Sequence, residues 1–202
     1  SPEILAKKNS LGKCRLCAMT LPDGLSRLPA YIQGALEAIW DGTTADSQES
    51  MTLEFKEDPS HREGADRARP KLVEKLVDEA ICMANSEVGS GIIIVGVHDK
   101  VGGPEAFTGT DLREADIEQK IFNASKPNMN VSATGVLFRG TRLLAVHIPE
   151  ARALYTRTDG AAKRRETDGG KFSCKPIPEE TRRAIDALRR NPDSVSYTHL
   201  RA

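Results

Sequence analysis

The sequences ESMTLEFK at residues 49–56 and GIIIVGVHD at residues 91–99 decide the fold of this chain. In the first stretch, Leu53 and Phe55 alternate with polar neighbours, which predicts a strand with one apolar face. The second stretch is apolar almost without a break, which is typical of a strand covered on both faces. Both stretches carry acidic residues near their ends, so we expect the two strands to bring carboxylates to one rim of one sheet.

The other elements follow from apolar periodicity and from Gly, Pro and Asn signals. Thr110 or Asp111 is expected to cap one of the helices. The order of elements predicts an α/β or α+β layered domain, in which helices flank a mixed β-sheet. We expect helices at residues 26–40, 70–84, 111–124 and 178–190, strands at 52–56 and 92–97, a hairpin of 131–138 with 142–148, and a short strand near Phe172.

A chain of 202 residues is long enough for one domain with flanking segments. It begins without Met, and its last eight residues resemble translated adapter sequence from library preparation, so we expect an incomplete gene fragment with an artefactual end. We divide the chain into a lead-in with a helix (1–47), the main domain (48–175), a C-terminal helix (176–194) and the adapter-like segment (195–202).

Composition favours a cytoplasmic protein. No apolar run approaches the roughly 20 residues that a membrane span needs. The four cysteines are too few and too scattered for a disulfide scaffold, which favours a reducing compartment. Cys82 lies beside an apolar helical stripe and is expected to be a core thiol, and Cys174 has no evident partner. Cys14 and Cys17 form half of a zinc motif, and their role is left open.

The charges are unevenly distributed although the net charge is zero. Residues 41–120 hold 9 Lys or Arg against 18 Asp or Glu, whereas residues 151–190 hold 11 against 6. A whole-chain charge argument for nucleic acid therefore fails. A local argument remains, because a basic segment can contact phosphates while an acidic site holds a metal ion. The alternative is a solvated surface of mixed sign.

Three carboxylates are the candidate catalytic and metal-binding residues. Glu49 and Glu54 come from the first strand region, and Asp99 follows the second strand. Carboxylates suit Mg²⁺ or Mn²⁺, and open sheets bind ligands beyond their strand ends. The alternative is a set of surface acids in which Glu54 pairs with Lys56 or with a basic loop.

Basic residues form a second candidate site, for nucleic acid. Phosphate contact requires only positive charge and reach, so a flexible basic loop without a ligand is the alternative. A phosphate-binding loop of the type Gly-x-x-x-x-Gly-Lys-Ser/Thr does not occur, so nothing in the sequence favours ATP. The candidate nucleic-acid-binding residues are Lys56, Lys163, Arg164, Arg165 and Lys171.

Several motifs in order resemble the Schlafen AlbA-like domain family over roughly residues 48–175. These are Glu-Ser-x-x-x-Glu-Phe-Lys at 49–56, a helix that ends in Ala84-Asn85, the strand at 93–97 followed by Asp99, and a hairpin that ends in Ile148-Pro149. The resemblance implies a DNA-binding domain of the kind found in many bacterial transcriptional regulators. In nuclease-active Schlafens, two glutamates and an aspartate at these motifs form a metal-dependent RNA-cleaving site.

Those catalytic roles would fall on Glu49, Glu54 and Asp99. The chain departs from the family pattern in its glycine turn, which is spread over residues 89–91, and in its later basic-glycine motif, which is blurred over residues 163–170. Three hypotheses follow. The first is a nucleic-acid-binding module of a bacterial regulatory protein, the second a metal-dependent endoribonuclease, and the third a protein-interaction domain. DNA or RNA is the expected partner, a membrane is not, and homo-oligomerisation is left open.

Overall fold

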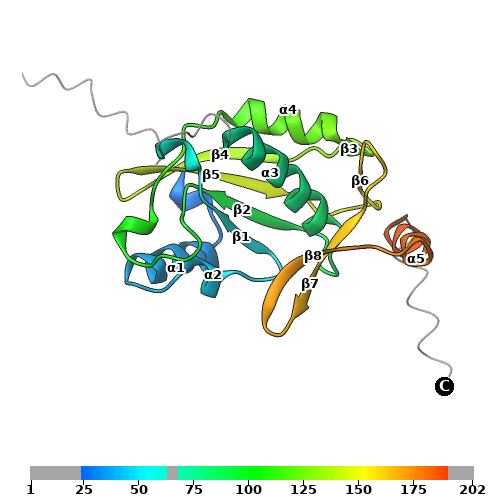
Figure 1. Ribbon diagram of the computed structural model, residues 1–202, viewed down its shortest axis with the longest axis horizontal. Coiled ribbons are helices and arrows are strands. Elements are labelled where there is room, and N and C mark those ends of the chain that lie inside the picture. The colour runs from blue at the N-terminus through cyan, green and yellow to red at the C-terminus, as the bar shows by residue number, and fades with distance from the viewer. Residues whose placement is uncertain (1–23, 63–67, 191–202) are drawn as a thin grey trace, which may run out of the picture.

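The computed structural model describes residues 24–62 and 68–190, and a four-stranded sheet lies at its centre. β1 runs parallel to β2, whereas β2 pairs antiparallel with β5 and β5 antiparallel with β4. The mixed sheet lies between helices (Figure 1), which confirms the predicted α+β class. In spatial order the strands are β1 (Leu53–Lys56), β2 (Gly91–Val95), β5 (Thr141–Ile148) and β4 (Ser132–Phe138).

Helices cover both faces of this sheet and create two apolar clusters. The helix α3 (Ala68–Ala84) and the helix α4 (Glu114–Ala124) pack on one face, where apolar residues at helical spacing form a continuous stripe on α3. The helix α1 (Ala30–Trp40) packs on the other face, and the short helix α2 (Ala45–Gln48) contacts β1. The main helices and strands lie close to the residues predicted from periodicity.

Alternation along β1 sends neighbouring side chains into opposite layers. Leu53 and Phe55 are buried in the α1 cluster, as predicted, and each such side chain contributes about 1.5–3 kcal/mol to folding. Glu54 faces the α3 layer. The sequence placed Glu54 on an open polar face, but only 5 % of it is exposed, because side chains of α3 and of a later hairpin cover it.

The strands β1 and β2 and the helix α3 between them form a parallel β-α-β unit. Their carboxyl ends therefore lie at the same edge of the sheet, which is where open sheets bind ligands. Gly96 directly follows β2 with φ 105°, and a Cβ there would lie 2.8 Å from the carbonyl carbon of Gly109. Only glycine fits this turn, which leads the chain to Asp99.

The basic segment differs most from the sequence prediction. It was considered as a loop, but it forms the strand β7 (Lys163–Asp168), which pairs with β8 (Lys171–Pro176) as a hairpin. The short strand predicted near Phe172 is part of β8. The strand β7 escaped detection because all six of its residues are polar or charged, whereas hydrophobic periodicity reports only apolar residues.

Smaller elements were also missed. The helix α2 lies between the predicted helix at 26–40 and the predicted strand at 52–56, where no element was expected. The helix α4 begins at Glu114 without a side-chain cap, because Thr110 instead donates to Asp58 and accepts from the Leu112 backbone. The remaining elements are the paired strands β3 (Ser125–Lys126) and β6 (Thr156–Arg157), the 3₁₀ helices Leu25–Arg27, Pro59–His61 and Pro104–Ala106, and the helix α5 (Glu179–Arg190).

Cys82 and Cys174 form a disulfide, with their Cα atoms 5.8 Å apart. The bond joins α3 to β8, so the predictions of a core thiol at Cys82 and of a Cys174 without a partner are wrong. Sequence spacing did not reveal the pair because 92 residues separate the two cysteines. Cys14, Cys17 and the adapter-like end lie outside the described residues.

Within residues 24–62 and 68–190, no helix combines the length and the apolar character needed to cross a bilayer. The predicted domain boundaries stay a prediction, although α1, which was assigned to the lead-in, shares an apolar cluster with β1 and β2.

Candidate functional site

Glu54 lies at the centre of a buried network of charges between β1, α3 and β7. Its Oε2 is 2.6 Å from Nη1 of Arg165, and its Oε1 pairs with the ammonium group of Lys56. Lys56 follows two residues later on β1, so strand alternation places it on the same face as Glu54. Both oxygens of the Glu54 carboxylate therefore face cations of the same chain.

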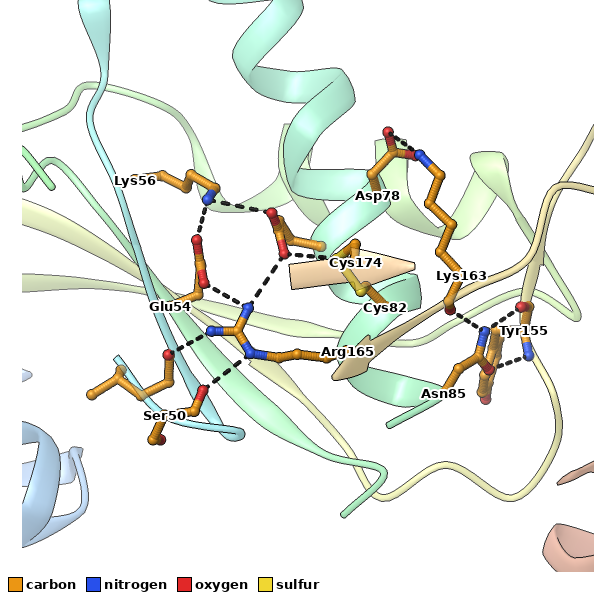
Figure 2. Close-up of a disulfide and its surroundings, with 12 residues drawn as sticks. Ser50, Glu54, Lys56, Asp78, Cys82, Asn85, Tyr155, Lys163, Arg165 and Cys174 are labelled. Atoms are coloured by element: carbon orange, nitrogen blue, oxygen red, sulfur yellow. Dashed lines mark hydrogen bonds and ion pairs between the residues drawn. A yellow bond between two sulfur atoms is a disulfide. The ribbon is translucent and has the colours of Figure 1, made fainter. Parts of the chain in front are cut away.

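Arg165 reaches this network from β7 and is only 2 % exposed. Its Nε donates to the backbone oxygen of Ser50 at 3.0 Å, and its Nη2 donates to that of Leu53 at 3.3 Å (Figure 2). The guanidinium carbon also lies 5.1 Å from the centre of the Phe172 ring, which permits a cation–π contact. Arg165 thus ties the β7–β8 hairpin to the start of β1.

Glu79 of α3 completes the network with a second carboxylate. Its oxygens lie 3.3 Å from Nζ of Lys56 and 3.6 Å from Nη1 of Arg165. Burial raises the pKa of Glu79, and the nearby charge of Glu54 adds to the rise, while Lys56 opposes it. Burial lowers the pKa of Lys56, but the charges of Glu79 and Glu54 outweigh burial, so the net pKa of Lys56 is raised.

The sequence analysis did not select Glu79, although a signal was present. Glu79 follows Leu76 by three residues and precedes Met83 by four, which puts it on the buried stripe of α3. An acidic residue on an apolar stripe indicates a buried ion pair, because an unpaired charge is costly to bury. The partners of such a residue come from distant strands and cannot be read from local spacing.

Glu49 lies just before β1 and is close to the charged network. Its Oε1 accepts a hydrogen bond from the backbone N–H of Phe55 at 3.3 Å. Burial, followed by the neighbouring charge of Glu54, raises the pKa of Glu49 to about 7. Glu49 and Glu54, two of the three predicted site carboxylates, therefore interact with each other.

Asp99 lies beyond the end of β2, and 48 % of its side chain is exposed. Its Oδ1 lies 3.4 Å from Nδ1 of His98, and its backbone oxygen accepts from the N–H of Asp46. The ligand oxygens of Glu49, Glu54 and Asp99 are not all within 4.8 Å of one another. A wider arrangement, in which a metal ion and its waters bridge them, stays a prediction.

The charge network bears on whether a metal ion fits here. A metal ion at Glu54 would have to displace Lys56 or Arg165 from its oxygens. In the part of the chain that the structure describes, Glu79, Cys82 and Cys174 bring their potential ligand atoms within 4.8 Å of one another. The two sulfurs are bonded to each other, so this group does not offer two thiolates to a metal. A metal ion at Glu54 would therefore require the ion pairs of Glu54 to open, and the predicted metal site stays a prediction.

Asn85, in the helix-end motif, holds the end of α3 to two later strands. Its Nδ2 donates to the backbone oxygens of Tyr155 and Lys163, at 2.7 and 2.9 Å, and its Oδ1 accepts from the Tyr155 N–H (Figure 2). The side chain is buried, so it satisfies backbone groups that water cannot reach. This motif residue therefore has a structural role, which fixes the start of β7 beside α3.

Of the predicted nucleic-acid-binding residues, several are paired with acids. Lys56 and Arg165 belong to the buried network, and Arg164 pairs with Glu166 on its own strand. Lys163 lies 4.0 Å from Asp78. Lys171, at the hairpin turn, is exposed. Much of the positive charge of the hairpin is thus offset by neighbouring carboxylates.

Comparison with known proteins defines the family. The family described as Schlafen, AlbA_2 matches residues 49–172, which span the sheet, the charge network and most of the β7–β8 hairpin. The chain belongs to the Schlafen AlbA_2 family. This membership supports a role related to nucleic acids for the domain.

A solved structure shares the fold. The crystal structure of the DIP2311 protein from Corynebacterium diphtheriae is similar, with a TM-score of 0.56 and 27 % sequence identity. The similarity covers 81 % of the present chain but only 29 % of the DIP2311 chain, so the present chain spans less than a third of that protein. No curated protein matches the sequence.

Proposed function

We propose that this chain is a nucleic-acid-binding module of a bacterial regulatory protein. Membership of the Schlafen AlbA_2 family supports the nucleic-acid role. The observation that favours binding over cleavage is the state of Glu54, whose two oxygens face Arg165 and Lys56. A carboxylate that already neutralises two cations is poorly prepared to hold a metal ion, because the metal must first displace them.

A metal-dependent endoribonuclease is the second candidate, and a specific observation favours it. The pKa of Glu49 is raised to about 7 beside Glu54. Carboxyl groups with a pKa near the working pH are efficient at proton transfer, and they cluster at catalytic sites. In this alternative, Glu49, Glu54 and Asp99 hold Mg²⁺ or Mn²⁺ after the ion pairs of Glu54 have opened.

Parallel assays of binding and cleavage separate these functions. The full chain is incubated with labelled RNA and DNA in the presence of Mg²⁺, Mn²⁺ or a chelator. A non-denaturing gel reports binding, and a denaturing gel of the same samples reports strand length. The proposed function predicts retarded but uncut strands under every condition.

Cleavage that requires the metal and is lost in Asp99→Asn would establish the endoribonuclease instead. Asp99 is the suitable variant because its half-exposed carboxylate lies outside the buried network, so the substitution has little effect on folding. An absence of both retardation and cleavage at low salt would favour the protein-interaction hypothesis.

A further inference from the structure

A hollow of about 330 Å³ lies where β1 and β2 end, beside the first turns of α3. The end of β1 contributes Lys56 and Glu57 to its lining, and Asp99 comes from beyond β2. The helix α3 contributes Lys71 and Lys75, which are one turn apart and therefore on one face of the helix. The hollow thus occupies the ligand-binding edge of the parallel β-α-β unit.

Lys71 and Lys75 can contact a ligand, unlike the basic residues of the β7–β8 hairpin that are paired with acids. Both are exposed, and across the described ranges neither has an ion-pair partner. Lys56, by contrast, is paired with Glu54 and Glu79. Two unpaired ammonium groups on one wall of a hollow suit an anion, and the positive end of the α3 dipole lies nearby.

Acidic groups on the opposite wall must be included in the charge balance. Glu57 is bound by both oxygens to Arg62, at 2.7 and 2.8 Å, so its charge is offset. Asp99 lies near His98 and is half-exposed, where water screens its charge. The lysine wall therefore keeps uncompensated positive charge, while Asp99 disfavours an anion on its own side of the hollow.

We infer that this hollow seats a phosphate group of a nucleic-acid backbone, with Lys71 and Lys75 as the contacting residues. The inference rests on the proposed function and identifies the surface of the protein that contacts nucleic acid. It moves the contact away from the β7 segment, whose charges are offset, to the first turns of α3. A local phosphate contact of this kind does not require a net positive charge on the chain as a whole.

Charge reversal tests the inference directly. The full chain, the Lys71→Glu/Lys75→Glu variant and a control variant are titrated into labelled single-stranded and duplex oligonucleotides at about 25 mM salt. The control is Lys126→Glu/Arg183→Glu, which makes the same change in net charge at two exposed residues outside the hollow, neither of which has an ion-pair partner within the described part of the chain. Lys71→Arg/Lys75→Arg retains the charge at the hollow.

We expect the hollow variant to bind about tenfold more weakly for all sequences alike, and the slope of log affinity against log salt to fall in magnitude by about 1, because one phosphate contact is lost. The control is expected to bind within about threefold of the wild type, because it loses only the long-range part of the attraction. The arginine variant should bind like the wild type. Thermal unfolding of every variant checks that the fold persists.

A second readout identifies the ligand. Lysine acetylation followed by mass spectrometry reports which side chains a ligand shields, and oligonucleotide is expected to protect Lys71 and Lys75. Protection by inorganic pyrophosphate, combined with unchanged labelling in oligonucleotide, would assign the hollow to a small anion and overturn the inference. Equal weakening in the hollow and control variants would overturn it while leaving the proposed function intact. No binding by the wild type at low salt would overturn both.

Discussion

Arg165 is the residue that makes the charge network a structural unit. It pairs with Glu54 and satisfies two backbone oxygens while being 2 % exposed, so its loss leaves one oxygen of the buried Glu54 carboxylate, and both backbone oxygens, without their donor. Removing one partner of a buried ion pair costs about 3–5 kcal/mol. We therefore predict that Arg165→Met lowers the free energy of unfolding by about that amount, as measured by urea denaturation.

Arg164 provides the matched control for this prediction. It lies next to Arg165 on β7, but its pair with Glu166 is partly exposed, and such pairs contribute less than about 1 kcal/mol. Arg164→Met should therefore lower the free energy of unfolding by less than about 1 kcal/mol. In addition, the double variant Glu54→Gln/Arg165→Met should lose less free energy of unfolding than the sum of the losses in the two single variants. Equal losses in the two arginine variants would show that Arg165 is not buried in a network.

Glu49 gives the protein a pH dependence whose sign follows from its raised pKa. The folded state holds the Glu49 proton up to about pH 7, whereas a glutamate in the unfolded chain loses its proton near the ordinary glutamate pKa of 4.5. Protonation of Glu49 therefore favours the folded state, and this stabilisation is lost as pH rises from 4.5 through 7. Glu49→Gln, which keeps an acceptor for the Phe55 N–H, should be more stabilising at pH 8 than at pH 5.

Chemical denaturation at the two pH values measures this difference. Glu87→Gln is the control, because Glu87 is an exposed residue outside the network. The same difference between pH 5 and pH 8 in Glu49→Gln and Glu87→Gln would contradict the assignment of a raised pKa to Glu49.

At the scale of elements, the Cys82–Cys174 disulfide joins α3 to the hairpin that carries Arg165. Closing a loop of this length restricts the unfolded chain by about 4–5 kcal/mol in the chain-entropy account. Because either substitution breaks the bond, Cys82→Ala, Cys174→Ala and the double variant should show similar losses of stability.

Thermal unfolding of the three variants, with non-reducing peptide mapping of the wild type, checks this prediction. A linked peptide that contains both cysteines is the expected product. If Cys82 were only a core thiol, Cys82→Ala would lose stability through its cavity. Cys174→Ala would then be close to neutral, and that pattern would contradict the bond.

Across the whole molecule, the sequence predicted what depends on apolar periodicity. The central strands and the long helices were placed correctly because one face of each must be apolar to be buried. The disulfide and the pairing of Glu79 were missed because each depends on contacts between residues far apart in the chain. The strand β7 was missed because it has no apolar residues. Glu54 was selected as a catalytic and metal-binding residue, and that role stays a prediction. Its ion-pair partner Arg165 was not foreseen, because Arg165 and its contact Leu53 are 112 residues apart and local spacing does not encode that approach.

The central claim is that this Schlafen AlbA_2 chain binds nucleic acid through backbone phosphates, and the salt dependence of its affinity tests that claim most directly. Each phosphate contact releases counterions, so log affinity should fall linearly with log salt, with a slope that steepens by about 0.7–0.9 for each phosphate contacted, for RNA and DNA alike. Fluorescence anisotropy of labelled oligonucleotides over a salt series gives this slope. An affinity that does not change with salt, or no binding at the lowest salt, would contradict the account.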